Sequence, residues 1–173
     1  DEARKIWGAI GVETRTIARQ AKAWVERSSS SESQKETTVP PLLPRQLSKK
    51  LAELLSWCAA APIALKAAVA TDVEGKALLK GEGRCHTEGG GFEGVLTRGQ
   101  ARRLLRATSG KPLLAPPCVL DEISRGLASL PLSDILLSTL DARVAAIAAL
   151  ASGADRLKRQ PIPPAYTRNT ARF

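Results

Sequence analysis

The chain has 173 residues, of which 43% are hydrophobic, and this combination excludes an intrinsically disordered chain and allows one domain with a core. Its net charge of +9 indicates an affinity for anions of some kind. Because the chain has only three Trp, one Tyr and two Phe, we expect an aliphatic core built from helices.

The first 45 residues predict one helix followed by a linker. Residues 1–27 repeat apolar side chains at helical spacing, and basic side chains complement them. The apolar positions are Ile6, Ile10, Ile17, Ala21 and Trp24, and the basic ones are Arg4, Lys5, Arg15, Arg19 and Lys22. Residues 28–45 combine a serine run, mixed charges and prolines, which is typical of a flexible linker.

The middle of the chain predicts helices interrupted by proline and then by glycine. Within 46–80, an apolar face on residues 47–58 indicates a helix that Pro62 should kink or divide, and a second helix is expected from Asp72 to Lys80. Residues 81–97 carry six glycines around Cys85 and His86, which predicts a mobile loop insertion.

Residues 98–160 predict three more helices. Arg98 to Thr108 is a short basic helix ended by a Gly-then-Pro signal, and the pair Pro116-Pro117 opens the next helix. A long helix over 134–158 follows, with apolar positions Leu136, Leu140, Val144, Ile147 and Leu150. Residues 161–173 form a proline-rich entry to another helix that would start near position 164. The fold class expected is therefore all-α.

No pattern in the chain predicts an enzyme, a metal site or a cofactor site. His86 and Cys85 cannot complete a zinc site, and adjacent residues in a glycine loop lack the third group that would orient a catalytic pair. The glycines do not form a phosphate-binding loop. Three widely spaced cysteines indicate no disulfide framework and favour a reducing compartment. With no run of about 20 uninterrupted apolar residues, we expect no membrane span among these residues.

Four segments carry a family resemblance that covers nearly the whole chain. The stretch Pro161-Ile162-Pro163, Tyr166-Thr167-Arg168 and Arg172-Phe173 resembles the segment before a membrane helix in the bestrophin-like anion channels. Trp7-Gly8, with Arg15 and Arg19 after it, is similar to the segment that follows the second membrane helix of that family. Residues 61–66 and 153–157 resemble two further family segments, although residues 67–72 depart from the family pattern.

The resemblance implies that the chain is a piece of a longer protein, an extramembrane segment between the second and third membrane helices. In the family, five subunits surround a pore, and this segment forms a cytosolic or stromal vestibule. A second constriction at a helix start maps onto Pro117, Cys118 and Val119, with Cys118 as the principal candidate. Tyr166, Arg168 and Arg172 would lie at the membrane surface.

The function that the resemblance implies is passive conduction of chloride, and of bicarbonate, by a homopentamer anchored in lipid through flanking helices, with no nucleic-acid partner. The Ala/Gly/Arg-rich insertions hint at an alga, so a thylakoid membrane is expected, with the plasma membrane as the alternative. The competing hypothesis is a soluble basic helical protein that binds nucleic acid or an acidic partner with an affinity that falls steeply with salt.

Overall fold

The computed structural model describes residues 2–31, 44–80 and 92–159, and helices account for nearly all of them. In chain order the elements are α1 (Glu2–Ser31), α2 (Pro44–Val69), α3 (Asp72–Lys80), the 3₁₀ helix η2 (Phe92–Gly94), α4 (Arg98–Thr108), the 3₁₀ helix η3 (Pro112–Leu114), α5 (Ala115–Ala128) and α6 (Asp134–Arg159). The described ranges contain no strand, so the all-α prediction is confirmed for them.

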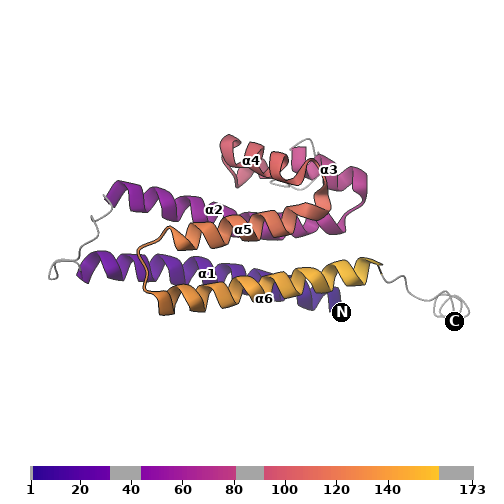
Figure 1. Cartoon of the computed structure of the whole chain (residues 1–173). Helices are drawn as coiled ribbons and strands as arrows, with labels where there is room; N and C mark the ends of the chain where they lie inside the picture. The colour runs from indigo at the N-terminus through magenta and orange to yellow at the C-terminus, as the bar shows by residue number, and fades with distance from the viewer. Residues whose placement is uncertain (1, 32–43, 81–91, 160–173) are drawn as a thin grey trace, which may run out of the picture.

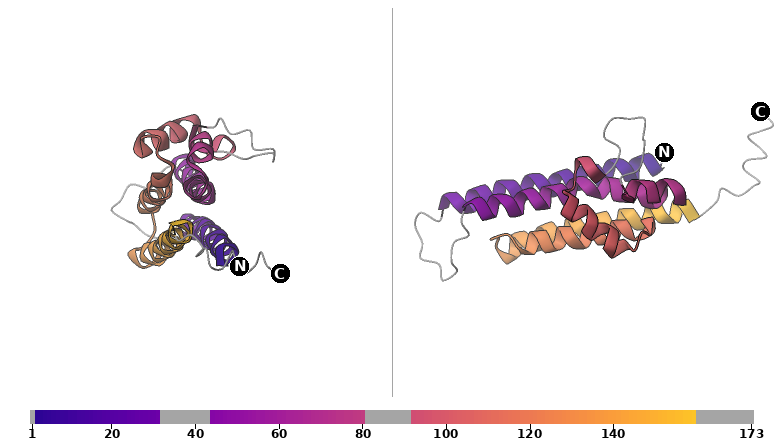
Figure 2. Two further views of the ribbon diagram at one scale, coloured as in Figure 1. Left: turned by 90° about the vertical axis from the view of Figure 1, so that its right-hand side faces the viewer. Right: turned by 90° about the horizontal axis from the view of Figure 1, so that it is seen from above.

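Four helices form an elongated bundle, and two short helices cover one side of it (Figure 1). Helix α1 packs against α6 and α2, while α5 packs against α2 and α6, as the end-on view of Figure 2 shows. Helices α3 and α4 lie over α2 and α5, and η3 joins them to the bundle. The start of α1 and the end of α6 lie at the same end of the bundle.

The core is mainly aliphatic, as the composition predicts, but two aromatic side chains lie within it. Trp57 and Phe92 are only 1% and 2% exposed and are the two largest of the fully buried side chains. The aliphatic side chains buried with them include Ile10, Ile17, Leu54, Val119, Ile123 and Leu140. Three of the predicted apolar positions of α6, Leu140, Val144 and Ile147, face this core.

Capping interactions explain where α4 begins and ends. The Thr97 side chain accepts a hydrogen bond from the Gln100 backbone N–H at 3.3 Å, and the Thr97 backbone N–H donates to the Gln100 Oε1 at 2.9 Å. Such a capping box satisfies two N–H groups that a helix start leaves free. At the other end, Ser109 and Gly110 both adopt left-handed backbone angles, with φ of 51° and 70°. The Gly-then-Pro stop is thus confirmed, although the left-handed turn begins at Ser109, one residue before the glycine.

Several predicted boundaries move in the structure. Helix α1 extends to Ser31 and α2 begins at Pro44, so both helices take residues from the segment assigned to the linker. Helix α2 runs through Pro62 without a break, which rules out its division into two helices. Residues on both sides of Pro62 are held in the core, since Ala61 and Ala64 are buried. Within the segment assigned to the glycine loop, Phe92 and Leu96 are buried, while residues 81–91 lie outside the described ranges.

Candidate functional site

The first turn of α5 holds the three residues predicted to form a constriction, and it presents them to different surroundings. Pro116 and Pro117 occupy the start of this helix, where the missing proline N–H costs no hydrogen bond. Pro117 is exposed, Cys118 is partly buried, and Val119 has no exposed surface. Within a single subunit, Pro117 and Cys118 are therefore the two of the three predicted residues that can contact an aqueous path.

The surroundings of Cys118 raise the pKa of its thiol. Burial raises the pKa of the Cys118 thiol above its ordinary value, the nearby carboxylates of Asp121 and Glu122 raise it further, and Arg125 lowers it. A protonated thiol is a small, weakly polar group with little reactivity. Cys118 therefore lacks the low pKa that a nucleophile or metal ligand needs.

A network of ion pairs joins α5 to its neighbours on the same side of the bundle. Arg125 bonds Asp121 and, at 3.1 Å, Glu122 on its own helix. Arg103 of α4 bonds Glu122 at 3.0 Å and Glu53 of α2 at 3.4 Å. The network holds α2, α4 and α5 together, so Arg103, a residue of the predicted short basic helix, has a structural role.

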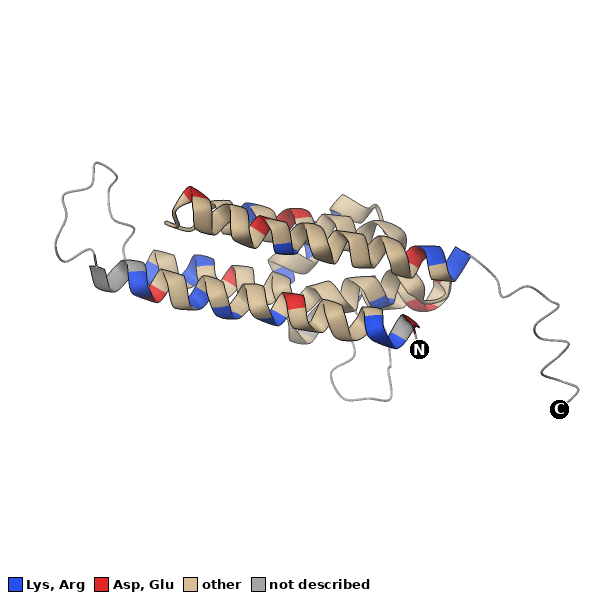
Figure 3. Cartoon of the chain, turned by 90° about the horizontal axis from the view of Figure 1, so that it is seen from below, with Lys and Arg blue, Asp and Glu red and all other residues tan. Residues whose placement is uncertain are grey.

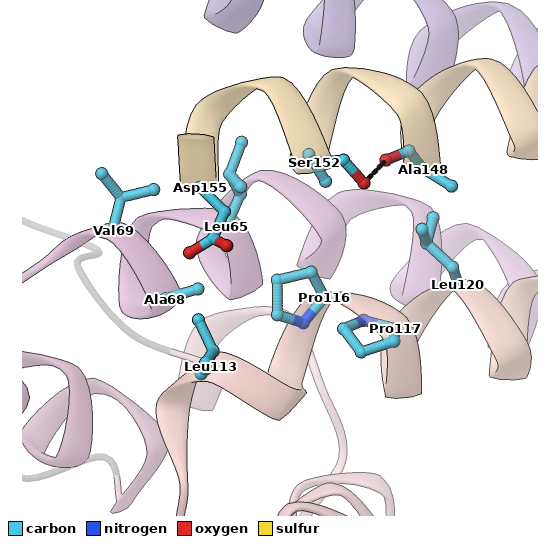
Figure 4. Close-up of a pocket in the computed structure, with 11 residues that line it drawn as sticks. Leu65, Ala68, Val69, Leu113, Pro116, Pro117, Leu120, Ala148, Ser152 and Asp155 are labelled. Atoms are coloured by element: carbon cyan, nitrogen blue, oxygen red, sulfur yellow. Dashed lines mark hydrogen bonds between the residues drawn. The ribbon is translucent and has the colours of Figure 1, made fainter. Parts of the chain in front are cut away.

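A largely apolar cavity of about 300 Å³ opens beside Pro117, where α2, η3, α5 and α6 converge (Figure 4). Its lining comprises Leu65, Ala68, Val69, Leu113, Pro116, Pro117, Leu120, Ala148, Ala151, Ser152 and Asp155. Asp155 is the charged member of this lining, and its carboxylate accepts a bond from Arg159 at 2.8 Å. Ser152 donates to the Ala148 carbonyl of its own helix at 3.0 Å. With its polar groups already bonded, this lining offers an apolar surface.

The residues that carry the family resemblance are divided between the described and the undescribed parts of the chain. Trp7, Gly8 and Arg19 lie on α1, where all three are at least partly exposed. Pro161, Ile162, Pro163, Tyr166, Thr167, Arg168 and Arg172 lie outside the described residues, as do Cys85 and His86. Among the described residues, no three His, Cys, Asp or Glu side chains come together to hold a metal ion.

Contacts between residues distant in the chain are the part of this site that sequence reasoning missed. Arg143 of α6 bonds Glu13 at 2.9 Å and Gln20 at 3.1 Å, both on α1. The Lys158 ammonium donates to the carbonyls of Ala68 and Ala70, at 2.8 and 2.9 Å, and so fixes the end of α6 to the end of α2. No local pattern could signal these pairs, because each side chain reads as an ordinary surface charge.

Two helices are long and apolar enough to cross a membrane, by length and composition alone: Arg45–Val69 and Asp134–Arg159. The sequence predicted no such segment because polar residues interrupt both apolar runs. In α2, half of the apolar window is buried in the bundle, as in the core helix of a folded domain. In α6 only 17% of the window is buried, so much of its apolar surface faces outward.

Comparison with known proteins gives one family. The chain matches the family described as Bacterial/Fungal Bestrophin protein over residues 1–173. No curated protein and no solved structure matches the chain. The match spans all four resembling segments, including those outside the described residues. The chain therefore belongs to the bestrophin family of membrane ion channels.

Proposed function

We propose that the chain forms the extramembrane vestibule of a pentameric anion channel that conducts chloride, and bicarbonate, passively. The observation that carries the proposal is the family match over residues 1–173. The net charge of +9 supports anions as the permeant species, because an excess of cationic side chains raises the local anion concentration. The soluble, nucleic-acid-binding alternative loses its basis, since family membership places the protein in a membrane.

The packing of α1 supports an extramembrane position for the bundle, despite the apolar surface of α6. Helix α1 lies along α6 and is joined to it by the Arg143–Glu13 ion pair. Helix α1 carries five exposed cations: Arg4, Lys5, Arg15, Arg19 and Lys22. Figure 3 shows the basic residues spread along this helix. Charged side chains in hydrocarbon are costly, so a bundle that contains α1 is stable in water and not in the bilayer core.

For the constriction we propose Pro117 and Cys118, which a ring of five subunits would bring around the ion path. Small, weakly polar side chains hydrate poorly and can hinder ions by partial dewetting. Val119 supports the constriction from within the core, because its side chain has no exposed surface. No covalent bond is made or broken in such a step, which agrees with the absence of an enzyme pattern in the sequence.

Chloride efflux from liposomes that contain the complete protein tests the proposal. We expect efflux with anions favoured over cations, and no efflux from protein-free liposomes. Cys118→Trp should reduce conductance or alter the selectivity among anions while assembly is retained. Cation efflux in place of anion efflux would contradict the anion assignment. Unchanged currents in Cys118→Trp would move the constriction to another exposed apolar side chain, such as Ile135 in the first turn of α6, which is 79% exposed.

The organelle is tested separately by fractionation of the source cells. We propose a thylakoid membrane, with the plasma membrane as the alternative outcome, and an antibody against the chain would show which fraction holds the protein.

A further inference from the structure

The outward side of α6 carries small apolar side chains, and none of the other described helices packs on it. Asp134–Arg159 contains an 18-residue window with a mean hydropathy of 1.6 of which only 17% is buried. Its middle is formed by exposed small side chains, which we call the α6 face: Ala142, Ala145, Ala146 and Ala149. Small side chains allow the axis of another helix to approach closely. Two exposed carboxylates, Asp134 and Asp141, lie near the N-terminal end of α6, and the Asp141 carboxylate also accepts a hydrogen bond from Ser124 of α5 at 3.3 Å.

The outward side of α1 has the complementary charge and an unexplained glycine. Its five cations, Arg4, Lys5, Arg15, Arg19 and Lys22, fall within about 100° of one another on a helix of 3.6 residues per turn, and we call this surface the α1 face. Of these five cations, only Lys22 lies within 4 Å of a carboxylate among the described side chains. Its partner is Glu26, at 3.9 Å.

Gly8 lies in the middle of the α1 face, and nothing inside the described chain requires a glycine there. A Cβ added at Gly8 would meet no atom within 4 Å. A glycine in a helix interior costs roughly 0.5–1 kcal/mol relative to alanine, so the position lacks a reason in the fold of one subunit. The side chains beside it, Trp7 and Val12, are 36% and 54% exposed. This local surface has two exposed apolar side chains and no side chain at its centre, and it fits the approach of a helix from outside the chain.

We propose that the α1 face of one subunit docks on the α6 face of the next copy, in a head-to-tail ring. The inference rests on the proposed pentamer and names its contact surface. Helices α1 and α6 lie on different flanks of the bundle, lower right and lower left in the end-on view of Figure 2, and a head-to-tail repeat requires two different surfaces of this kind. A symmetry axis parallel to the bundle would keep α1 and the neighbouring α6 antiparallel, as they are within one subunit.

Charge sets the register of this contact. The cations Arg15, Arg19 and Lys22 lie in the C-terminal half of α1, and Asp134 and Asp141 lie at the start of α6. An antiparallel pairing that brings these opposite charges together places Gly8 opposite Ala149. Opposite charges across an interface fix its register and exclude wrong partners.

Cysteine cross-linking of the complete protein in membranes tests the contact. In a background in which Cys58, Cys85 and Cys118 are replaced by alanine or serine, Gly8→Cys combined with Ala149→Cys should give a ladder of covalent oligomers on oxidation. Each single substitution should leave monomers. The matched control pairs Ala149→Cys with Val73→Cys on α3, a site that is 80% exposed and lies on another side of the molecule, and it should also leave monomers.

Charge reversal tests the register. Arg19→Asp should abolish the ladder, and the addition of Asp141→Arg should restore it. Monomers from every α1–α6 cysteine pair would overturn the proposal, as would dimers from Ala149→Cys alone, which would indicate a two-fold contact between α6 faces. Retention of acidic vesicles or duplex DNA by the α1 face, without any ladder, would assign the face to that partner and overturn the proposal too.

The outcomes for the contact and for the channel are separable. Anion efflux without a ladder would contradict the contact and leave the channel intact, whereas a ladder without anion efflux would contradict the proposed function.

Discussion

The two described cysteines differ in exposure and so provide a reactive site and its internal control. Cys58 is 3% exposed, and burial raises the pKa of its thiol to about 12. Only about one thiol in 10⁴ would then be ionised at pH 8, and the thiolate is the reactive form. Cys118 is partly buried, with a smaller rise in pKa caused by burial, Asp121 and Glu122. The described part of the chain therefore contains one accessible and one protected thiol, on neighbouring helices.

The first prediction concerns thiol modification. In a Cys85→Ser background, a maleimide should label Cys118 within minutes and leave Cys58 unlabelled in the native protein. Because the pKa of Cys118 is raised, the rate should climb about tenfold per pH unit between pH 7 and 8.5. Mass spectrometry of the peptides measures both sites. Labelling of Cys58 at a comparable rate would show that the bundle opens, and a pH-independent rate at Cys118 would contradict its raised pKa.

The second prediction follows from the pKa of Cys58 and concerns alkaline stability. The folded pKa of about 12 exceeds the ordinary value of 9.0, so the unfolded chain releases the thiol proton first as pH rises. The contribution of the buried, neutral thiol to the free energy of unfolding is fully present below pH 9 and is lost progressively above pH 9. The difference in Tm between the natural chain and Cys58→Ala should therefore shrink from pH 8 to pH 10.5. A constant difference over that range would contradict the burial of this thiol.

At the scale of the elements, glycine positions separate close packing from open surface. On α3, a Cβ at Gly75 would lie 2.4 Å from the Ala67 carbonyl oxygen and 2.8 Å from Pro112 Cβ. The glycine thus allows α3 to rest directly on the end of α2 and on η3. A Cβ added at Gly8 on α1 would meet no atom within 4 Å. Substitution by alanine should therefore change the stability of the chain in opposite directions at the two glycines.

The third prediction compares these two glycines. Gly75→Ala should destabilise the chain by about 1–3 kcal/mol, because the added methyl group forces α3 away from backbone that cannot yield. Gly8→Ala should stabilise the 173-residue chain by about 0.5–1 kcal/mol, since alanine loses less conformational entropy in a helix. Urea unfolding followed by circular dichroism measures both. Equal effects of the same sign would contradict the packing described for α3.

The fourth prediction concerns the bond between the ends of α6 and α2. Lys158→Met removes the ammonium that binds the Ala68 and Ala70 carbonyls and should destabilise the chain by about 0.5–1 kcal/mol, a range that allows for the exposure of this side chain. Arg156→Met, two residues earlier and also exposed, is the matched control and should change stability by less. Urea unfolding of both variants checks the difference, and equal losses would assign the effect to charge alone.

The sequence predicted most helices because their signals are local. The spacing of Ile10, Ile17 and Ala21 predicted α1, and the proline pair at 116–117 predicted a helix from Cys118, three residues after the observed start of α5 at Ala115. The extension of α1 to Ser31 was missed because a serine run resembles a linker. The continuity of α2 through Pro62 was missed because packing on both sides of the proline offsets the lost hydrogen bond. Tertiary contacts, which no local sequence pattern encodes, determine both the length of α1 and the continuity of α2.

The candidate site was less predictable than the fold. Helical spacing could not show that Val119 turns inward while Pro117 faces out, since this depends on which side of α5 meets α2. The Arg103–Glu122–Arg125 network joins residues from two helices, and no local sequence pattern pairs them. The motif at 161–173 gave the family correctly, although those residues lie outside the described ranges.

At the scale of the whole molecule, the excess positive charge predicts how conductance depends on salt. A cationic vestibule enriches anions above their bulk concentration, and the enrichment is strongest when the Debye length exceeds about 10 Å, below roughly 0.1 M salt. The fifth prediction is that chloride conductance falls less than proportionally as KCl is lowered from about 1 M to about 0.05 M. Single-channel recording of the complete protein measures this. A strictly proportional fall would contradict electrostatic enrichment.

The shared location of the start of α1 and the end of α6 has a mechanical consequence for the proposed channel. If both connections lead to the membrane, the bundle is attached at one end and free at the other. Because its four long helices pack on one another, we expect the bundle to move as one body. Helix α1 has 30 residues and is about 45 Å long, so a tilt of about 5° at the attached end would swing the free end by about 4 Å. Such a bundle acts as a lever arm, converting small rotations of the membrane helices into larger displacements at its far tip, beside the turn that joins α5 to α6.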